Sequence, residues 1–161
     1  MMEENKSTLT KEKDIDQTVY EKAHEIKTSA NRSYYRKMEE IGKMFIRDKI
    51  KYLIDEDDFE VEDGLFARCR DEDFLPADAV VTLVAKINGR QVAIIANDLT
   101  IKAGTWGKKT IEKIIRMQEL AEKRKIPLIY MIDSAGSRLN EQFETFTDRR
   151  HAGKIFYNTA R

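Results

Sequence analysis

The sequence has too few cysteines for a disulfide, no excess of charge of one sign and no long apolar run. One cysteine, Cys69, in 161 residues excludes an internal disulfide and offers no spacing for a metal site, so we expect a buried or inert thiol and no bound metal. Basic and acidic residues both number 29, and the zero net charge indicates no general affinity for nucleic acid or an anionic membrane. The polar start lacks a signal peptide, and no apolar run reaches membrane-spanning length. We therefore expect one cytoplasmic domain, or a piece of one.

Proline is also scarce, and neither of the two prolines interrupts the first third of the chain. Residues 1–14 are charged, which predicts a mobile, disordered tail. Over residues 15–54 apolar side chains recur at helical spacing, which predicts a helical N-terminal region with a break near Ser33 or Gly42. The acidic run Asp55–Gly64 then reads as a solvated linker rather than a metal site. Residues 55–161 form the predicted main domain.

The second half changes to a pattern typical of strands. The stretch AVVTLVAKINGRQVAIIANDLT reads as two β-rich runs joined by Asn88-Gly89, both of which tolerate the positive φ of a type I′ hairpin turn. A helix is predicted over KKTIEKIIRMQELAEKRK, followed by a strand over Ile126–Ile132 that fits burial on both faces. This order predicts an α/β fold with mainly parallel crossover units.

The last segment, DRRHAGKIFYNTAR, predicts the start of another helix. Its expected apolar face consists of Ala152, Ile155, Phe156 and Ala160. No capping glycine, turn or closing strand follows, so we expect the chain to end inside its fold.

The end of the predicted buried strand, Ile132-Asp133-Ser134-Ala135-Gly136, allows more than one kind of site. A nucleophile elbow needs a small residue on both sides of the serine, and here an isoleucine stands before Asp133. The sequence holds two histidines, His24 and His151, to act as a base. A serine hydrolase is therefore the less favoured interpretation, and Ser134 is expected to hydrogen-bond to the following turn.

Two further segments could bind an anion. The stretch AGTWGKKT opens a helix, so its main-chain amides, with Lys108 and Lys109, could receive a phosphate, although exposed lysines are common on helices. The basic cluster Arg149, Arg150, His151 and Lys154 could clamp a carboxylate or phosphate, but a solvated helix start is favoured.

Several motifs in order resemble the carboxyltransferase β subunits of biotin-dependent acyl-CoA carboxylases, of the propionyl-CoA and methylcrotonyl-CoA carboxylase type. They are Ala96–Thr100 (ANDLT), Ala103–Thr105 (AGT), Asp133–Arg138 (DSAGSR) and the pattern D-R-x-H-x-G-x-x-F-Y-N near the end, which is closest to the methylcrotonyl type. The upstream MFIRDKIKYLIDEDDFEVEDGLF also resembles a helix of that family. The resemblance runs from about residue 36 to the last residue.

The resemblance implies a crotonase-like fold of β-β-α units in a spiral, here incomplete and preceded by the N-terminal helices. It implies transfer of a carboxyl group from carboxybiotin, held by a biotin carboxylase or biotin carrier partner, to the α-carbon of an acyl-CoA. Main-chain amides at Ala135 and Gly136 would stabilise the enolate oxygen. The thioester would lie along Ala103, Gly104 and Thr105, with Ser134 and Arg138 beside it, and small side chains would let the amides approach.

The resemblance also sets expectations about the whole protein. Where the family often has two glycines, this chain has Ala103-Gly104 and Ala135-Gly136, a change that leaves the amide donors in place. A further glycine-rich turn and a second, biotin-holding domain would lie beyond Arg161, so we expect an N-terminal portion that is inactive alone and forms a homo-oligomer at full length. The alternative is a non-catalytic short paralogue that binds CoA esters or carboxylase subunits.

Overall fold

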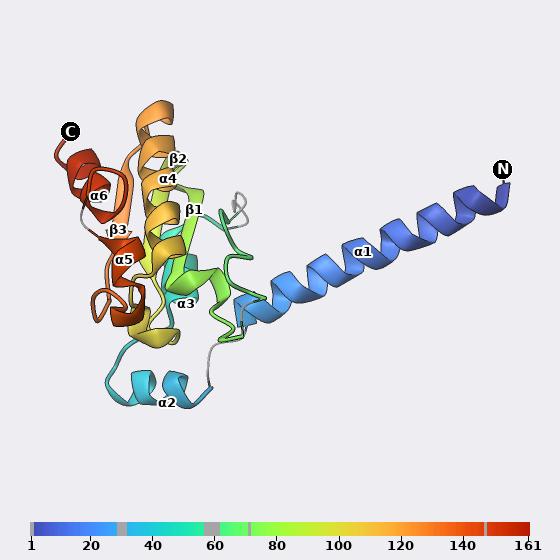
Figure 1. Ribbon diagram of the computed structural model, residues 1–161, viewed down its shortest axis with the longest axis horizontal. Helices are drawn as coiled ribbons and strands as arrows, with labels where there is room; N and C mark the ends of the chain where they lie inside the picture. Colours follow the sequence, from blue (N-terminus) through green and yellow to red (C-terminus); the bar gives the residue numbers. More distant parts are fainter. Residues whose placement is uncertain (1, 29–31, 57–61, 71, 147) are drawn as a thin grey trace.

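A small mixed sheet forms the centre of the molecule. The computed structural model describes residues 2–28, 32–56, 62–70, 72–146 and 148–161. The sheet has the order β1-β2-β3, with β1 at Val80–Ile87, β2 at Arg90–Asn97 and β3 at Leu128–Met131. Strands β1 and β2 are antiparallel. Strands β2 and β3 are parallel, and the helix α4 (Lys108–Arg124) lies between them in the sequence. Helices cover the sheet (Figure 1), which confirms the predicted α/β class.

The predicted hairpin between β1 and β2 is confirmed. Ile87 pairs with Arg90, and Asn88 and Gly89 between them have φ values of 51° and 75°, as a type I′ turn requires. The two carboxylate oxygens of Asp55 each accept one of the turn's main-chain N–H groups, both at 2.8 Å. The first residue of the acidic run therefore caps the hairpin.

The side chains of strands β1 and β2 alternate between two apolar cores. One core joins the sheet to α4 and to α6 (Ala152–Thr159), and the other joins the opposite face to α3 (Ile46–Leu53). Side chains on a strand alternate between the two faces of the sheet. Because helices from different regions of the chain cover each face, β1 and β2 are buried on both sides over most of their length. The first core includes Val80, Val84, Ala93 and Ile95, and the second Val81, Leu83, Val92 and Ile94.

Strand β3 differs from its prediction. It is shorter than Ile126–Ile132, its four residues are half-buried, and Ile132 beyond its end is 63% exposed. The expectation of full burial on both faces is wrong here, because the described elements cover each face of β3 only in part: Leu128 and Tyr130 pack against one core and Ile129 and Met131 against the other, and all four stay half-buried.

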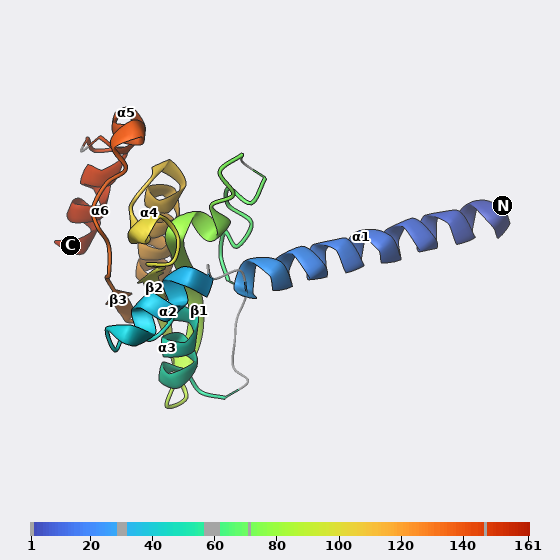
Figure 2. The same cartoon turned by 90° about the horizontal axis from the view of Figure 1, so that it is seen from below.

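The N-terminal region consists of three helices, α1 (Met2–Thr28), α2 (Arg32–Glu40) and α3. Gly42 takes a φ of 71° in the turn between α2 and α3, as the predicted break requires, and Ser33 lies in the first turn of α2. Residues 2–14, expected as a disordered tail, are helical here, consistent with their many strong helix formers. Helix α1 extends away from the rest of the molecule in both views (Figures 1 and 2). The domain boundaries themselves stay a prediction.

The acidic run is not simply a solvated linker. Residues 57–61 lie outside the described residues, but the Glu62 side chain is 1% exposed and accepts a fork of two hydrogen bonds from Arg47, at 2.6 and 3.0 Å. A carboxylate can be buried when a guanidinium neutralises it in this way, and a count of acidic residues does not reveal that.

The C-terminal segment contains α5 (Gln142–Thr145) and α6. Ala152 and Ile155 of α6 are buried in the core with α4, as predicted, whereas Phe156 is 64% exposed and Ala160 is also exposed. The predicted apolar face is therefore half correct. Short 3-10 turns connect the main elements: η1 (Pro76–Ala79), η2 (Lys102–Gly104) and η3 (Leu139–Glu141).

Candidate functional site

Two loops at one end of the sheet lie against each other. The first continues from η2 to Trp106, and the second follows β3 from Asp133 to Arg138. Trp106 donates its main-chain N–H to the Gly136 carbonyl at 2.8 Å, and the Arg138 N–H returns to the Trp106 carbonyl at 2.9 Å. The Ala135 N–H donates to the Ala103 carbonyl at 3.1 Å. The structure thus brings the predicted site residues of both motifs together, and we call these two segments the paired loops.

Gly104 allows this close approach. Its φ is 65°, and a Cβ at this position would collide with the main-chain oxygen of Asp133 in the second loop. The Asn97 side-chain amide donates to the Gly104 carbonyl at 3.2 Å and so holds the first loop to the end of β2. A backbone contact of this kind is available to glycine and to no other residue.

Ala135 and Gly136 are exposed, but their amides have partners within the chain. The Ala135 N–H donates to the Ala103 carbonyl, and the Gly136 N–H donates to the Ser134 hydroxyl at 3.1 Å. This bond confirms that Ser134 hydrogen-bonds to the turn that follows it. Rotation of the hydroxyl would free the Gly136 amide, while freeing Ala135 would require the loops to part. The oxyanion role of both residues stays a prediction.

The hydrolase interpretation gains no geometric support. Ser134 accepts a hydrogen bond from Gly136, and none of the described contacts joins it to a histidine. His24 lies on α1, and the His151 main-chain N–H is bonded to Asp148 at the start of α6.

A pocket of about 360 Å³ opens beside the paired loops. Asn97 and Asp133 line it and also contact the first loop, so pocket and loops are continuous. Lys43, in the turn after α2, donates to both oxygens of Asp133 at 2.7 and 3.0 Å and ties the helices to this strand end. The remaining lining residues are mostly apolar: Met38, Met44, Ile46, Lys49, Leu99, Tyr130, Met131 and Ile132. A larger cavity of about 1130 Å³, between α1, α2, α3 and β1, contains no residue of the paired loops.

Sequence reasoning missed this pocket because its walls come from three separate regions. Its one local signal was the cluster of methionines, Met38 and Met44, near the predicted break at Gly42. Methionine occurs at adaptable binding surfaces, but it also fills irregular gaps in apolar cores, so these two methionines did not by themselves indicate a pocket.

The predicted phosphate position at the start of α4 is already filled by the chain's own carboxylates. Glu141 accepts the Lys108 main-chain N–H at 2.9 Å, and Asp78 accepts the Thr110 N–H at 2.6 Å. These acids satisfy the donors that a helix N-terminus leaves open, so an anion at this place is not supported. The hydrogen bonds to Arg68, Arg138 and the Lys108 amide keep the pKa of Glu141 below its usual value against the opposing effect of desolvation by burial.

The basic cluster has the geometry of a solvated helix start. Asp148 accepts the main-chain N–H groups of Arg150 and His151 at 2.7 and 2.8 Å, and these bonds lower the pKa of its carboxyl group. The Lys154 ammonium group pairs with Glu119 of α4. Arg149 and Arg150 are exposed, so the favoured interpretation fits.

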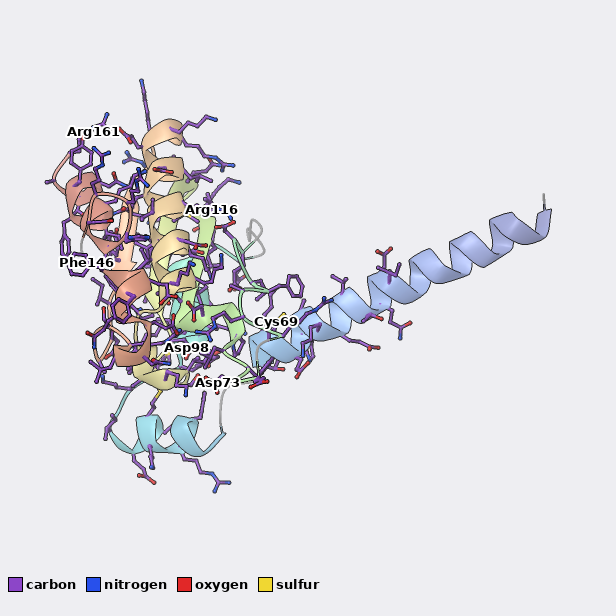
Figure 3. All side chains as sticks on the ribbon, viewed as in Figure 1. Cys69, Asp73, Asp98, Arg116, Phe146 and Arg161 are labelled. Atoms are coloured by element: carbon purple, nitrogen blue, oxygen red, sulfur yellow. The ribbon has the colours of Figure 1, made fainter. Side chains whose placement is uncertain are left out.

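Arg138 has a different position from the one expected of a ligand contact. Its side chain is 6% exposed, and its guanidinium group donates to Asp78, Glu141 and Thr105. A buried group with these partners acts within the protein. Cys69, expected to be buried or inert, is partly buried in a loop beside α1 (Figure 3).

Two ionisable groups, Asp98 before the first loop and Lys113 on α4 after it, are buried. Asp98 lies inside the molecule (Figure 3) and accepts the N–H and hydroxyl of Thr100 at 2.9 and 2.6 Å, while desolvation by burial raises its pKa. Burial lowers the pKa of Lys113 to about 8. Among the described residues, no group of three or more His, Cys, Asp or Glu side chains could hold a metal ion.

The fold agrees with comparisons to known proteins. The carboxyl transferase domain family matches residues 37–161. This chain belongs to that family. As a carboxyl transferase domain it has the crotonase-like fold that the resemblance implied.

Relatives of this carboxyl transferase domain are longer than the chain. An uncharacterised carboxylase, YngE, of Bacillus subtilis is 50% identical over 145 residues, which cover 90% of this chain and 28% of that protein. The β1 subunit of a biotin-dependent 3-methylcrotonyl-coenzyme A carboxylase of Mycobacterium tuberculosis is 39% identical over 120 residues, which cover 74% of this chain and 23% of that subunit. The chain therefore spans about a quarter of the length of these relatives.

A solved structure supports the same assignment. The transcarboxylase 12S hexamer with hydrolysed methylmalonyl-coenzyme A bound superposes with a TM-score of 0.80 at 27% identity, over 88% of this chain and 28% of the other. The family predicted from the motifs is thereby confirmed. In the described part of the chain, no helix is long and apolar enough to cross a membrane.

Proposed function

We propose that the chain forms part of a carboxyltransferase that moves a carboxyl group from carboxybiotin to the α-carbon of an acyl-CoA. Membership of the carboxyl transferase domain family supports the reaction type, and the functions of the relatives support a biotin-dependent acyl-CoA carboxylase. The observation that carries the proposal is the paired loops, where small residues place main-chain groups at an exposed surface.

We expect the exposed part of the paired loops to accept a flat thioester with the ring of carboxybiotin beside it. Ala135 and Gly136 are exposed, and a Cβ added to Gly136 would meet no atom within 4 Å, so open space lies next to that amide. Main-chain donors aimed at a developing enolate oxygen stabilise the transition state without a charged side chain. Carboxybiotin would supply the carboxyl group as carbon dioxide, and its ring nitrogen would take the proton that the α-carbon loses.

The chain's own residues would bind and orient the acyl-CoA. When Ser134 rotates away, the Gly136 N–H can donate to the thioester oxygen, and Ala103–Thr105 would lie along the CoA arm. The apolar pocket beside Asp133 would accept an apolar part of the same ligand. The biotin would come from a biotin carboxylase or carrier partner.

Because the chain spans about a quarter of its relatives, the proposal includes no complete reaction by these residues alone. Binding can be tested without turnover. A ligand that binds only the folded chain raises its stability, by about 2.7 kcal/mol at a hundredfold excess over Kd. We expect propionyl-CoA and methylcrotonyl-CoA to raise the melting temperature by several degrees, and more than free CoA does.

Two variants make this experiment specific. Ala135→Leu places a large side chain on the exposed surface of the second loop and should abolish the shift while the fold survives. Ala160→Leu adds the same bulk on the exposed end of α6 and should keep the shift. If the thioesters leave the melting temperature of the unmodified chain unchanged, or shift Ala135→Leu equally, the proposed site is wrong.

A further inference from the structure

Asp78 lies in a turn that the backbone would not adopt without support. Ala77, Asp78 and Ala79 are consecutive residues with φ values of 54°, 50° and 60°. A left-handed conformation is strained for any residue with a side chain, so surrounding contacts must hold this turn. Lys113, buried on α4, provides some of them, since its ammonium group donates to the Ala77 carbonyl at 2.8 Å and to the Val80 carbonyl.

The turn places the Asp78 carboxylate between three regions of the fold. The residue is 0% exposed. One oxygen accepts the Thr110 N–H at 2.6 Å and the Thr110 hydroxyl at 2.9 Å, which anchors it to the first turn of α4. The other oxygen accepts a hydrogen bond from the Arg138 guanidinium group, which belongs to the loop after β3.

Arg138 in turn contacts the first of the paired loops. Its Nη2 donates to the Thr105 carbonyl at 3.0 Å, and its Nε lies 3.4 Å from the Thr105 hydroxyl. The main chain of Arg138 also donates to Trp106. One planar side chain therefore spans both loops, with its far end fixed by Asp78.

We propose that Asp78 and Arg138 form a buried positioning pair that sets the spacing of the paired loops. The inference rests on the proposed function only for its consequence, namely that this spacing aligns Ala135 and Gly136 with a thioester. A guanidinium group can donate to a carboxylate and a carbonyl in one plane, whereas an ammonium group cannot reproduce that fork. Arg138 acts through the main chain of other residues, and neither member of the pair touches the ligand.

Amide hydrogen exchange of the whole chain, resolved by residue, tests the pair without any ligand. In Arg138→Lys and Asp78→Asn, we expect the inter-loop amides of Trp106 and Ala135 to exchange at least about tenfold faster. The β2 amides of Ile94 and Ile95 should keep their rates, because a loss of loop spacing leaves the sheet intact. The matched control Arg116→Lys changes an exposed ion pair with Asp63 and should leave all of these rates unchanged.

A measurement on the unmodified chain covers the case in which a variant does not fold. The Nε–H of Arg138 should exchange much more slowly than that of the exposed Arg116. Equal rates for these two groups would overturn the proposal, and so would unchanged inter-loop amides, or a uniform acceleration that includes β2, in the folded variants.

The ligand experiment separates this inference from the proposed function. Loss of loop protection in Arg138→Lys supports the positioning pair whether or not acyl-CoA binds to the unmodified chain. If the unmodified chain binds propionyl-CoA, Arg138→Lys should weaken that binding about tenfold or more, while Arg116→Lys should not. Equal affinity of Arg138→Lys and the unmodified chain would contradict the role of loop spacing in binding.

Discussion

Gly104 is the residue on which the contact between the loops depends most directly. Gly104→Ala would place a methyl group against the Asp133 carbonyl oxygen at a φ of 65°. We expect a loss of about 2–4 kcal/mol in the free energy of unfolding, from strain and from separation of the loops. Urea denaturation followed by circular dichroism measures it.

The control for this prediction is Gly89→Ala in the hairpin turn. Gly89 has a similar positive φ, 75°, but nothing lies within 4 Å of an added Cβ. It should cost only the conformational strain, about 1–2 kcal/mol. Equal losses in the two variants would mean that the close approach at Gly104 contributes nothing.

Single residues were predicted well where the reason is local. Ser134 and Asn88 follow from turn chemistry, and each has the predicted hydrogen bond or φ value. The close approach of Gly104 to Asp133 was not predicted. The Asp78–Arg138 pair was not foreseen, because its members are separated by 60 positions and no periodic pattern marks a buried ion pair. The burial of Lys113 was hidden in the same way, since a lysine on an amphipathic helix normally reads as exposed.

At the scale of elements, periodicity identified the hairpin and α4 nearly to the residue. It did not settle the burial of β3 or of Phe156, because burial depends on which neighbours cover an element. Charge, not periodicity, was the basis for expecting a disordered tail over residues 1–14, where the structure has the start of α1.

The end of α4 allows a direct test of an element boundary. Lys125 adopts the left-handed conformation that ends the helix, with a φ of 54°, and it is exposed. Lys125→Gly should therefore stabilise the chain by about 0.5–1 kcal/mol, because glycine takes this conformation without steric cost. Thermal denaturation followed by circular dichroism measures the change.

Lys123→Gly serves as the matched control, two residues earlier and still within α4. Here glycine should destabilise by up to about 1 kcal/mol, because it loses more backbone entropy than lysine when it is held in a helix. The same sign of change in both variants would show that α4 does not end at Lys125 as the structure has it.

At the scale of the whole molecule, the fold explains why the candidate site lies where it does. Strands β2 and β3 are parallel to each other, so the loops that follow them leave the sheet at the same end. Ligands in open α/β sheets bind outside the carboxyl ends of the strands. Four ordered motifs were specific enough to predict the family, although each was weak alone. The pocket between α2, α3 and β3 required the tertiary structure.

The central claim is that an acyl-CoA binds at the paired loops, and amide chemical-shift mapping with propionyl-CoA tests it most directly. We predict that the largest changes fall on Ala103–Thr105 and Ser134–Gly136, followed by the pocket residues Met38 and Met131. Changes confined to the cavity between α1, α3 and β1, or no changes at ligand concentrations that saturate related sites, would contradict the claim.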